Sequence, residues 1–202
     1  LKNIDCSNNA LTTLNIKDLV LHTFNASNNQ LTTLETTPTS LIAATFLDIS
    51  NNNLTSFEFD ADALTDFQFN DNPLQSMTIN GYAANQTLDF SSITTLESLK
   101  LSGFTLNELV IGSLPAFTKL NLNLDVIQPV LLENMPMLKN IVASSPNTEI
   151  ICSNLSAFSA IIPIYEFTAA EKFEVTCKKM TFKNSTTLLT AYTNFHVEEL
   201  VL

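Results

Sequence analysis

Residues 21–31, LHTFNASNNQL, carry the pattern that decides the fold, and close variants of it recur along the chain. Apolar residues occupy its first, fourth, sixth and eleventh positions, and an asparagine, Asn29, occupies the ninth. The same frame fits residues 1–11 (LKNIDCSNNAL), 44–54 (ATFLDISNNNL) and 64–74 (LTDFQFNDNPL), with starts 20, 23 and 20 residues apart. Such a spacing predicts a solenoid, in which each coil stacks on its neighbours because no coil can bury its own apolar edge.

Alternation at the fourth and sixth positions predicts a strand with one buried face. Most repeats carry a second alternating segment, which we also expect to be extended; examples are LTTLNI (11–16), LTSFEF (54–59), LQSMTI (74–79) and LNELVI (106–111). The stretch PVLLENMPML (129–138) is the best candidate for a helical turn. We expect the asparagine at the ninth position to turn inward and bond backbone groups, so that these side chains form a ladder.

The pattern is regular over residues 1–80 and degenerate over 81–202, and we treat the chain as one solenoid domain of about ten coils. Three weaker matches keep the apolar positions but lose the asparagine: residues 96–106, 117–127 and 138–148. Later strands are expected at 173–175 and 195–197. The stretches 80–95 and 149–169 do not fit one register, and each is expected to hold a shortened or distorted coil.

These matches resemble the leucine-rich-repeat family, most closely over residues 1–80. The resemblance implies a right-handed β/α-type superhelix, mostly β with little helix, and one parallel sheet on its concave face. Family members usually bind ligands on that face. The central position of each expected strand would face the ligand there: Asp5, Asn25, Asp48, Gln68, Lys100, Asn121, Val142, Glu174 and His196. This row contains no Trp, Tyr or Arg, the usual anchors of binding surfaces.

Composition narrows the possible partners. The net charge is −11, and the 9 basic residues are all lysines. Because nucleic-acid and anionic-membrane surfaces select basic patches, with Arg preferred for phosphate, we expect neither partner. No apolar run reaches the ~18 residues that a membrane helix needs, so we expect no membrane insertion. The chain begins inside a repeat, without an initiator Met or a signal peptide, which indicates a part of a longer chain.

No catalytic, metal or cofactor site is predicted. The two histidines, His22 and His196, lie far apart in the repeat array and have no nucleophile or carboxylate at a catalytic spacing. Asp60, Asp62 and Asp71 superficially resemble a calcium loop, but the EF-hand spacing and its closing Glu are absent, so we interpret them as turn residues.

Cysteines and glycosylation sequons bear on the compartment. Cys6 occupies a core position, whereas Cys152 and Cys177 lie 25 residues apart, close to one coil. They are either a disulfide between neighbouring coils or two thiols. The triplet N-x-S/T occurs five times, at Asn25, Asn53, Asn85, Asn154 and Asn184. With the low charge and the Asn/Thr/Ser-rich surface, these sequons favour a secreted glycoprotein with N-glycans; the alternative is a cytosolic or bacterial chain of unusual composition.

Two functions remain after enzymes are set aside. The first is an extracellular scaffold that associates with other proteins or with copies of itself, including assembly into a surface layer or filament. The uncapped first and last repeats favour it, because bare coils expose strand edges. The alternative is a recognition ectodomain that binds a protein or glycan on its concave face, although a glycan on Asn25 would obstruct that face.

Overall fold

The computed structural model describes residues 1–81, 86–155, 173–183 and 195–201. Throughout these ranges the regular structure consists of strands, their registered pairs are parallel, and no helix is present. The chain is a parallel β-solenoid, as the repeat spacing predicts. It divides into two compact units, Leu1–Ala84 with Leu101–Phe104, and Asn85–Lys100 with Thr105–Leu202.

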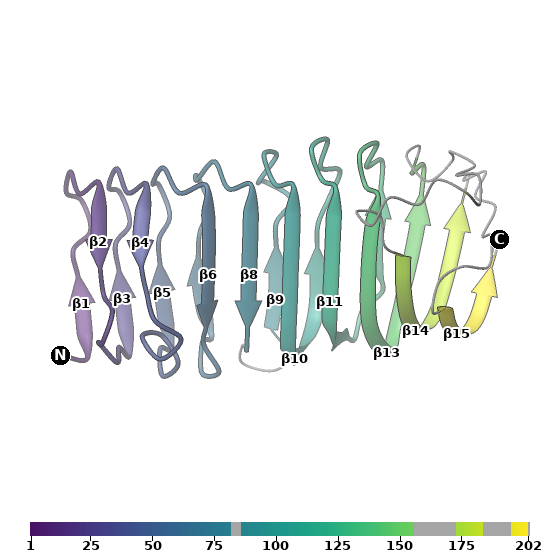
Figure 1. Cartoon of the computed structure of the whole chain (residues 1–202), viewed down its shortest axis with the longest axis horizontal. Helices are drawn as coiled ribbons and strands as arrows, with labels where there is room; N and C mark the ends of the chain where they lie inside the picture. Colours follow the sequence, from purple (N-terminus) through teal and green to yellow (C-terminus); the bar gives the residue numbers. More distant parts are fainter. Residues whose placement is uncertain (82–85, 156–172, 184–194, 202) are drawn as a thin grey trace. The chain divides into compact units, whose positions relative to one another are not determined.

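The first unit contains two strands in each coil. One strand of each coil joins a four-stranded sheet made of β1 (Asn3–Asp5), β3 (Thr23–Asn25), β5 (Phe46–Asp48) and β7 (Asp66–Gln68). The other strands pair as β2 (Thr13–Asn15) with β4 (Thr33–Glu35), and as β6 (Ser56–Asp60) with β8 (Ser76–Asn80). β1, β3 and β5 lie behind β2, β4 and β6 in Figure 1.

The second unit has longer strands, several of which bend around a corner of the coil. They are β9 (Gln86–Asp89), β10 (Ser98–Val110), β11 (Lys119–Val126), β12 (Val130–Glu133), β13 (Asn140–Ser153), β14 (Phe173–Lys183) and β15 (Phe195–Val201). Residues 101–104 of β10 belong to the first unit. The start of β13 pairs with β11 and its end with β12, and the pairing of β13 with β14 has a register shift between Ser145 and Glu149. β14 lies between β13 and β15.

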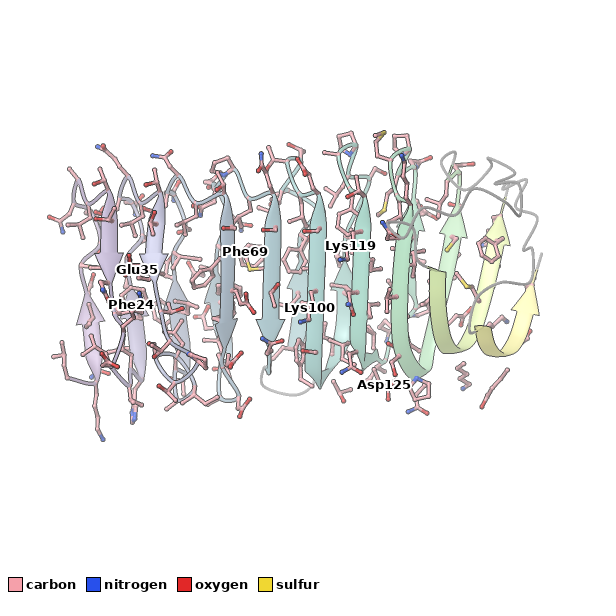
Figure 2. All side chains as sticks on the ribbon, in the orientation of Figure 1. Phe24, Glu35, Phe69, Lys100, Lys119 and Asp125 are labelled. Atoms are coloured by element: carbon pink, nitrogen blue, oxygen red, sulfur yellow. The ribbon has the colours of Figure 1, made fainter. Side chains whose placement is uncertain are left out.

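Stacked apolar side chains fill the interior of the first unit. The register places Phe24 between Ile4 and Leu47, and Leu47 next to Phe67. Phe24 and Leu47 are completely buried, and Figure 2 labels Phe24 on its strand. Complete burial of such a side chain stabilises a fold by roughly 1.5–3 kcal/mol. The recurring apolar positions of the sequence therefore form the core that we expect of stacked coils.

The predicted asparagine ladder is confirmed. Asn52 Nδ2 donates to the carbonyl of Ala26 in the preceding coil at 3.0 Å, and its Oδ1 accepts from the backbone N–H of Leu31 at 2.9 Å. Asn29 and Asn72 make the equivalent bonds one coil away. The residue before each ladder asparagine has a left-handed backbone, with φ between 53° and 57° (Asn8, Asn28, Asn51 and Asp71). Asn and Asp adopt this conformation more readily than other non-glycine residues, which explains the paired NN and DN letters.

The helical turn predicted at 129–138 is wrong. Residues Val130–Glu133 form β12, and the chain then turns at Asn134, whose φ is 54°. Val130 and Leu132 point inward while Leu131 is exposed. This is the two-residue period of a strand, and pairing with β13 overrides the helix-favouring composition of the segment.

The expectation of a single parallel sheet is also wrong, because the strands belong to three sheets. No helix covers the back of the coils within the described residues, so the β/α type of superhelix is not found there. The structure has about seven turns, so the estimate of about ten coils is not confirmed; part of it, residues 156–169, lies outside the described residues.

Candidate interaction surface

The predicted concave row does not form one surface. Its first four positions, Asp5, Asn25, Asp48 and Gln68, do lie in one sheet, in β1, β3, β5 and β7. Lys100 lies in β10 (Figure 2), and the later positions lie in β11, β13, β14 and β15, all of which belong to a different sheet. The side chains of Glu174 and His196 are outside the described residues.

Between residues 80 and 96 the repeat shifts by half a coil, so that the segment expected on the first side of its coil lies on the second side. In the first unit, Gly81 donates its N–H to the carbonyl of Ser102 at 2.8 Å, and Ser102 Oγ donates to Asn80 Oδ1 at 2.7 Å. The β10 segment around Ser102 therefore lies beside β8, which carries the second alternating segment of its coil. Sequence alone could not detect the slip, because both sides of a coil show the same apolar alternation and residues 96–106 lack the asparagine that marks the first side.

Local hydrogen bonds engage most of the polar row in the first sheet. Asp5, Asn25 and Asp48 each accept from the backbone N–H and the hydroxyl of the serine two residues later, at 2.6–3.0 Å. The hydrogen bonds from Ser7, first from its hydroxyl and then from its backbone, lower the pKa of the Asp5 carboxyl. These side chains stabilise the turn after each strand.

Cys6 and the cysteine pair have different surroundings. Burial, and secondarily the charge of Asp5, raises the pKa of the half-buried Cys6 thiol, which donates to the carbonyl of Asn25 at 3.4 Å. In the strand register, Cys152 lies opposite Phe182, whereas Cys177 lies opposite Ser145. The two cysteines are therefore not opposite each other, and the predicted disulfide receives no support from the register; the side chain of Cys177 is outside the described residues.

The sequons have unequal environments. Asn25 is half-buried, and its Oδ1 is occupied by Ser27. Asn53 is exposed. Asn154 is exposed with a left-handed φ of 53°, and its Nδ2 donates to Asn134 Oδ1 at 3.0 Å. Asn85 and Asn184 lie outside the described residues.

The residues that superficially resemble a catalytic or calcium site are separate. His22 is exposed, and Asp60 accepts from Asn80 Nδ2 at 2.9 Å, a bond between neighbouring coils. Among the residues that the structure describes, no three His, Cys, Asp or Glu side chains are close enough to hold a metal ion. The same residues contain no helix long and apolar enough to cross a membrane.

An apolar row on the outside of the second unit was missed by the sequence analysis. The register aligns Leu131, Ile151, Thr181 and Val201 on neighbouring strands β12, β13, β14 and β15. Leu131 is 48% exposed, Ile151 and Val201 are half-buried, and Thr181 is covered by its neighbours. We name these four residues the outer apolar row. Single exposed apolar side chains are common, but apolar side chains aligned on neighbouring strands form a contiguous patch, and such patches often mark a contact surface.

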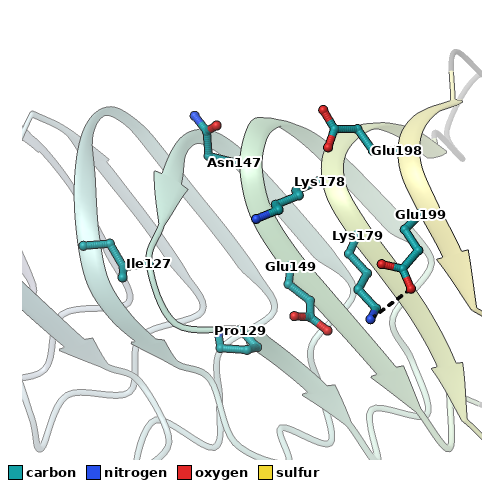
Figure 3. A pocket seen from close by; sticks show the side chains of 8 residues that line it. All are labelled: Ile127, Pro129, Asn147, Glu149, Lys178, Lys179, Glu198 and Glu199. Carbon is teal, nitrogen blue, oxygen red and sulfur yellow. Dashed lines mark ion pairs between the residues drawn. The ribbon is translucent and has the colours of Figure 1, made fainter.

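Charged and polar residues flank the outer apolar row on both sides. One flank aligns Glu149, Lys179 and Glu199, and Lys179 Nζ lies 3.1 Å from Glu199 Oε1 (Figure 3). This flank borders a hollow of about 230 Å³ at the corner of the coils, which Lys178 and Glu198 also line. On the other flank, Ser153 Oγ donates to Glu133 Oε1 at 3.1 Å, and Lys183 lies opposite Ser153. An apolar centre with a polar rim is the usual anatomy of a protein interface.

Outward rows of the first unit are polar by comparison. On β2 and β4 the outward pairs are Thr13 with Thr33 and Asn15 with Glu35, and on β6 and β8 they are Ser56 with Ser76 and Glu58 with Thr78. The outer apolar row does have a sequence signal. Val130–Leu132 and Ile150–Cys152 are runs of three apolar residues, and a strand that buries the outer two must expose the middle one.

Comparison with known proteins adds no assignment. No family model matches the chain, and neither a curated protein nor a solved structure matches it significantly.

Proposed function

We propose that this chain is a non-catalytic scaffold that acts by protein–protein association. The outer apolar row carries the proposal, because exposed Leu131 and half-buried Ile151 and Val201 lie in register between two polar flanks. A partner that covers this row would bury apolar surface at roughly 25 cal/mol per Å², while the flanking charges would orient it. Self-assembly into a surface layer or filament is one form of this function.

The family and the compartment belong to the same proposal. We propose a leucine-rich-repeat type of solenoid, supported by the 20–23-residue spacing and by the asparagine ladder at Asn29, Asn52 and Asn72. We propose an extracellular location with N-glycans, supported by the sequons. Exposed Asn53 offers an acceptor with no side-chain hydrogen bond to break, which makes it the first position to examine for a glycan.

Recognition on the concave face is the weaker alternative. The side chains at Asp5, Asn25 and Asp48 are short, and each is held by its own turn serine. A ligand would have to replace those hydrogen bonds, and no aromatic or arginine side chain in this row would anchor it. A partner could cover the outer apolar row without replacing hydrogen bonds of this kind.

Lysine cross-linking of the native material, with peptides identified by mass spectrometry, tests the proposal. Lys179 and Lys183 flank the outer apolar row, whereas Lys2 and Lys17 lie in the first unit and serve as internal controls. We expect intermolecular cross-links, to another polypeptide or to a second copy, to concentrate at the flanking lysines. If these lysines link to other molecules no more often than Lys2 and Lys17, association through this surface is refuted.

A further inference from the structure

We infer that the outer apolar row binds a second copy of this chain, face to face, about a two-fold axis that runs along the strands between β13 and β14. This inference rests on the proposed function and names its partner. The axis places β13 of one copy over β14 of the other, so that Ile151 faces Thr181. It also places β12 over β15, so that Leu131 faces Val201. Leu131, Ile151 and Val201, the members of the row that the single chain leaves exposed or half-buried, are then covered.

The charges of the first flank support this arrangement. Along the stacking direction the flank reads Glu149, Lys179, Glu199, with alternating sign. The two-fold operation places Glu149 of each copy opposite Lys179 of the other, which makes two symmetric opposite-charge contacts. Lys179 lies between two acidic residues of its own flank, so the facing Glu149 is directly opposite the cation and only diagonal to those two carboxylates.

The other flank is compatible with the same axis. Ser153 of one copy then faces Lys183 of the other, and a hydroxyl can accept a hydrogen bond from an ammonium group. A two-fold axis along the stacking direction would exchange the two flanks and bring Lys179 opposite Lys183. A two-fold axis along the strands but centred on β14 would bring Lys179 of one copy opposite Lys179 of the other. Both of these arrangements oppose like charges, which disfavours them.

The size of the contact predicts a weak dimer. Four strands spaced about 4.8 Å apart and five residues at about 3.3 Å each give a footprint of about 300 Å² per copy. A stable interface buries about 800 Å² per partner. We therefore expect a dimer that forms only at protein concentrations on the order of 100 μM and above, as for other contacts at the small end of the range.

A charge-exchange experiment on the full chain tests the partner. Glu149→Lys places Lys against Lys179 in the homodimer, and Lys179→Glu places two carboxylates together, so each variant alone should associate about tenfold more weakly than the wild type. A mixture of the two variants restores opposite charges at both contacts. Methyl NMR of labelled Glu149→Lys, titrated with unlabelled Lys179→Glu, should show shifts at Leu131, Ile151 and Val201 that neither variant shows with itself.

Controls separate this inference from the proposed function. Thermal unfolding followed by circular dichroism verifies that both variants fold. Val142→Asn, which changes a half-buried outward residue of β13 before its corner, should dimerise as the wild type does, whereas Ile151→Asn should not. A wild-type chain that stays monomeric to 1 mM (roughly tenfold above the expected onset), or a mixture that associates no better than its components, overturns the second copy as partner. Cross-links from Lys179 and Lys183 to a different polypeptide would still support the proposed association.

Discussion

Replacement of Asn52 by alanine tests the physical role of the asparagine ladder. Asn52 is buried and links three chain segments: its Oδ1 accepts from Leu31 N–H, and its Nδ2 donates to the carbonyls of Ala26, Ile49 and Ser50. Alanine at this position has neither the acceptor Oδ1 nor the donor Nδ2. The first coil provides a matched control in Asn9, which holds the same place in the repeat but is exposed.

The bonds that remain after the substitution set its magnitude. The Ala26 carbonyl keeps the Nδ2 of Asn29 at 3.1 Å, and the Ile49 carbonyl keeps the Nδ2 of Asn72 at 2.9 Å. Each carbonyl therefore loses one of two donors, at about 0.5–1 kcal/mol. Leu31 N–H has no second acceptor, and an orphaned buried donor costs about 1–3 kcal/mol. The total is about 3 kcal/mol for the free energy of unfolding of Asn52→Ala.

The expected cost of Asn9→Ala is below about 1 kcal/mol, because Asn9 Nδ2 donates only to the exposed turn carbonyls of Cys6 and Ser7, and Cys6 keeps the Nδ2 of Asn29. Urea unfolding followed by far-ultraviolet circular dichroism measures both variants. Because repeat arrays can unfold in parts, hydrogen exchange of peptides across residues 26–35 provides a local measurement. Equal costs for the two substitutions, or unchanged exchange of Leu31 N–H, would refute the ladder argument.

Three further substitutions have defined expectations. Gly112→Ala should lower the unfolding free energy by about 2 kcal/mol, because φ is 71° and the added Cβ would lie 2.9 Å from Ser91 Cβ; thermal unfolding measures it. Ser145→Ala should leave stability unchanged or raise it by up to about 1 kcal/mol in urea unfolding, since the buried Ser145 Oγ has no hydrogen-bond partner. Ser7→Ala should raise the lowered pKa of the Asp5 carboxyl in a carbon-13 NMR titration, because the strongest stabiliser of its charged form is removed.

Each of these expectations has a control or an outcome that contradicts it. Gly103→Ala also has a positive φ, of 86°, but its added Cβ would meet only a backbone nitrogen at 3.7 Å, so it should cost less than Gly112→Ala. Thr148→Val should destabilise where Ser145→Ala does not, because Thr148 Oγ1 accepts from Val126 N–H at 2.8 Å. For Asp5, a depressed pKa means stability present above the unfolded pKa and lost as the pH falls through the folded pKa. Ser7→Ala should bring the folded-state pKa of Asp5 closer to its unfolded value, so the pH range over which this stability is lost should become narrower. An unchanged Asp5 titration would contradict the role of the Ser7 hydroxyl.

The interaction surface was harder to predict than the coil. Runs such as Val130–Leu132 and Ile150–Cys152 were visible in the sequence, but the first of them was interpreted as part of a helical turn. The polar row was predicted at strand centres, whereas Asp5, Asn25 and Asp48 are the last residues of their strands, and the row was extended through Lys100 into a different sheet. The error arose where the asparagine was lost, because nothing else in the repeat distinguishes the two sides of a coil.

The amino-acid sequence by itself determined the stacked coils and the asparagine ladder, because both follow from which residues recur every twenty-odd positions and from the left-handed turn that Asn8, Asn28 and Asn51 adopt readily. Only the tertiary structure decided which sheet each strand joins and which outward row is apolar. Strand register is a choice between coils far apart in the chain. Two segments with the same apolar alternation can pair equally well with a neighbouring strand. The packing of whole coils therefore selects the register that aligns Leu131, Ile151 and Val201 in one row.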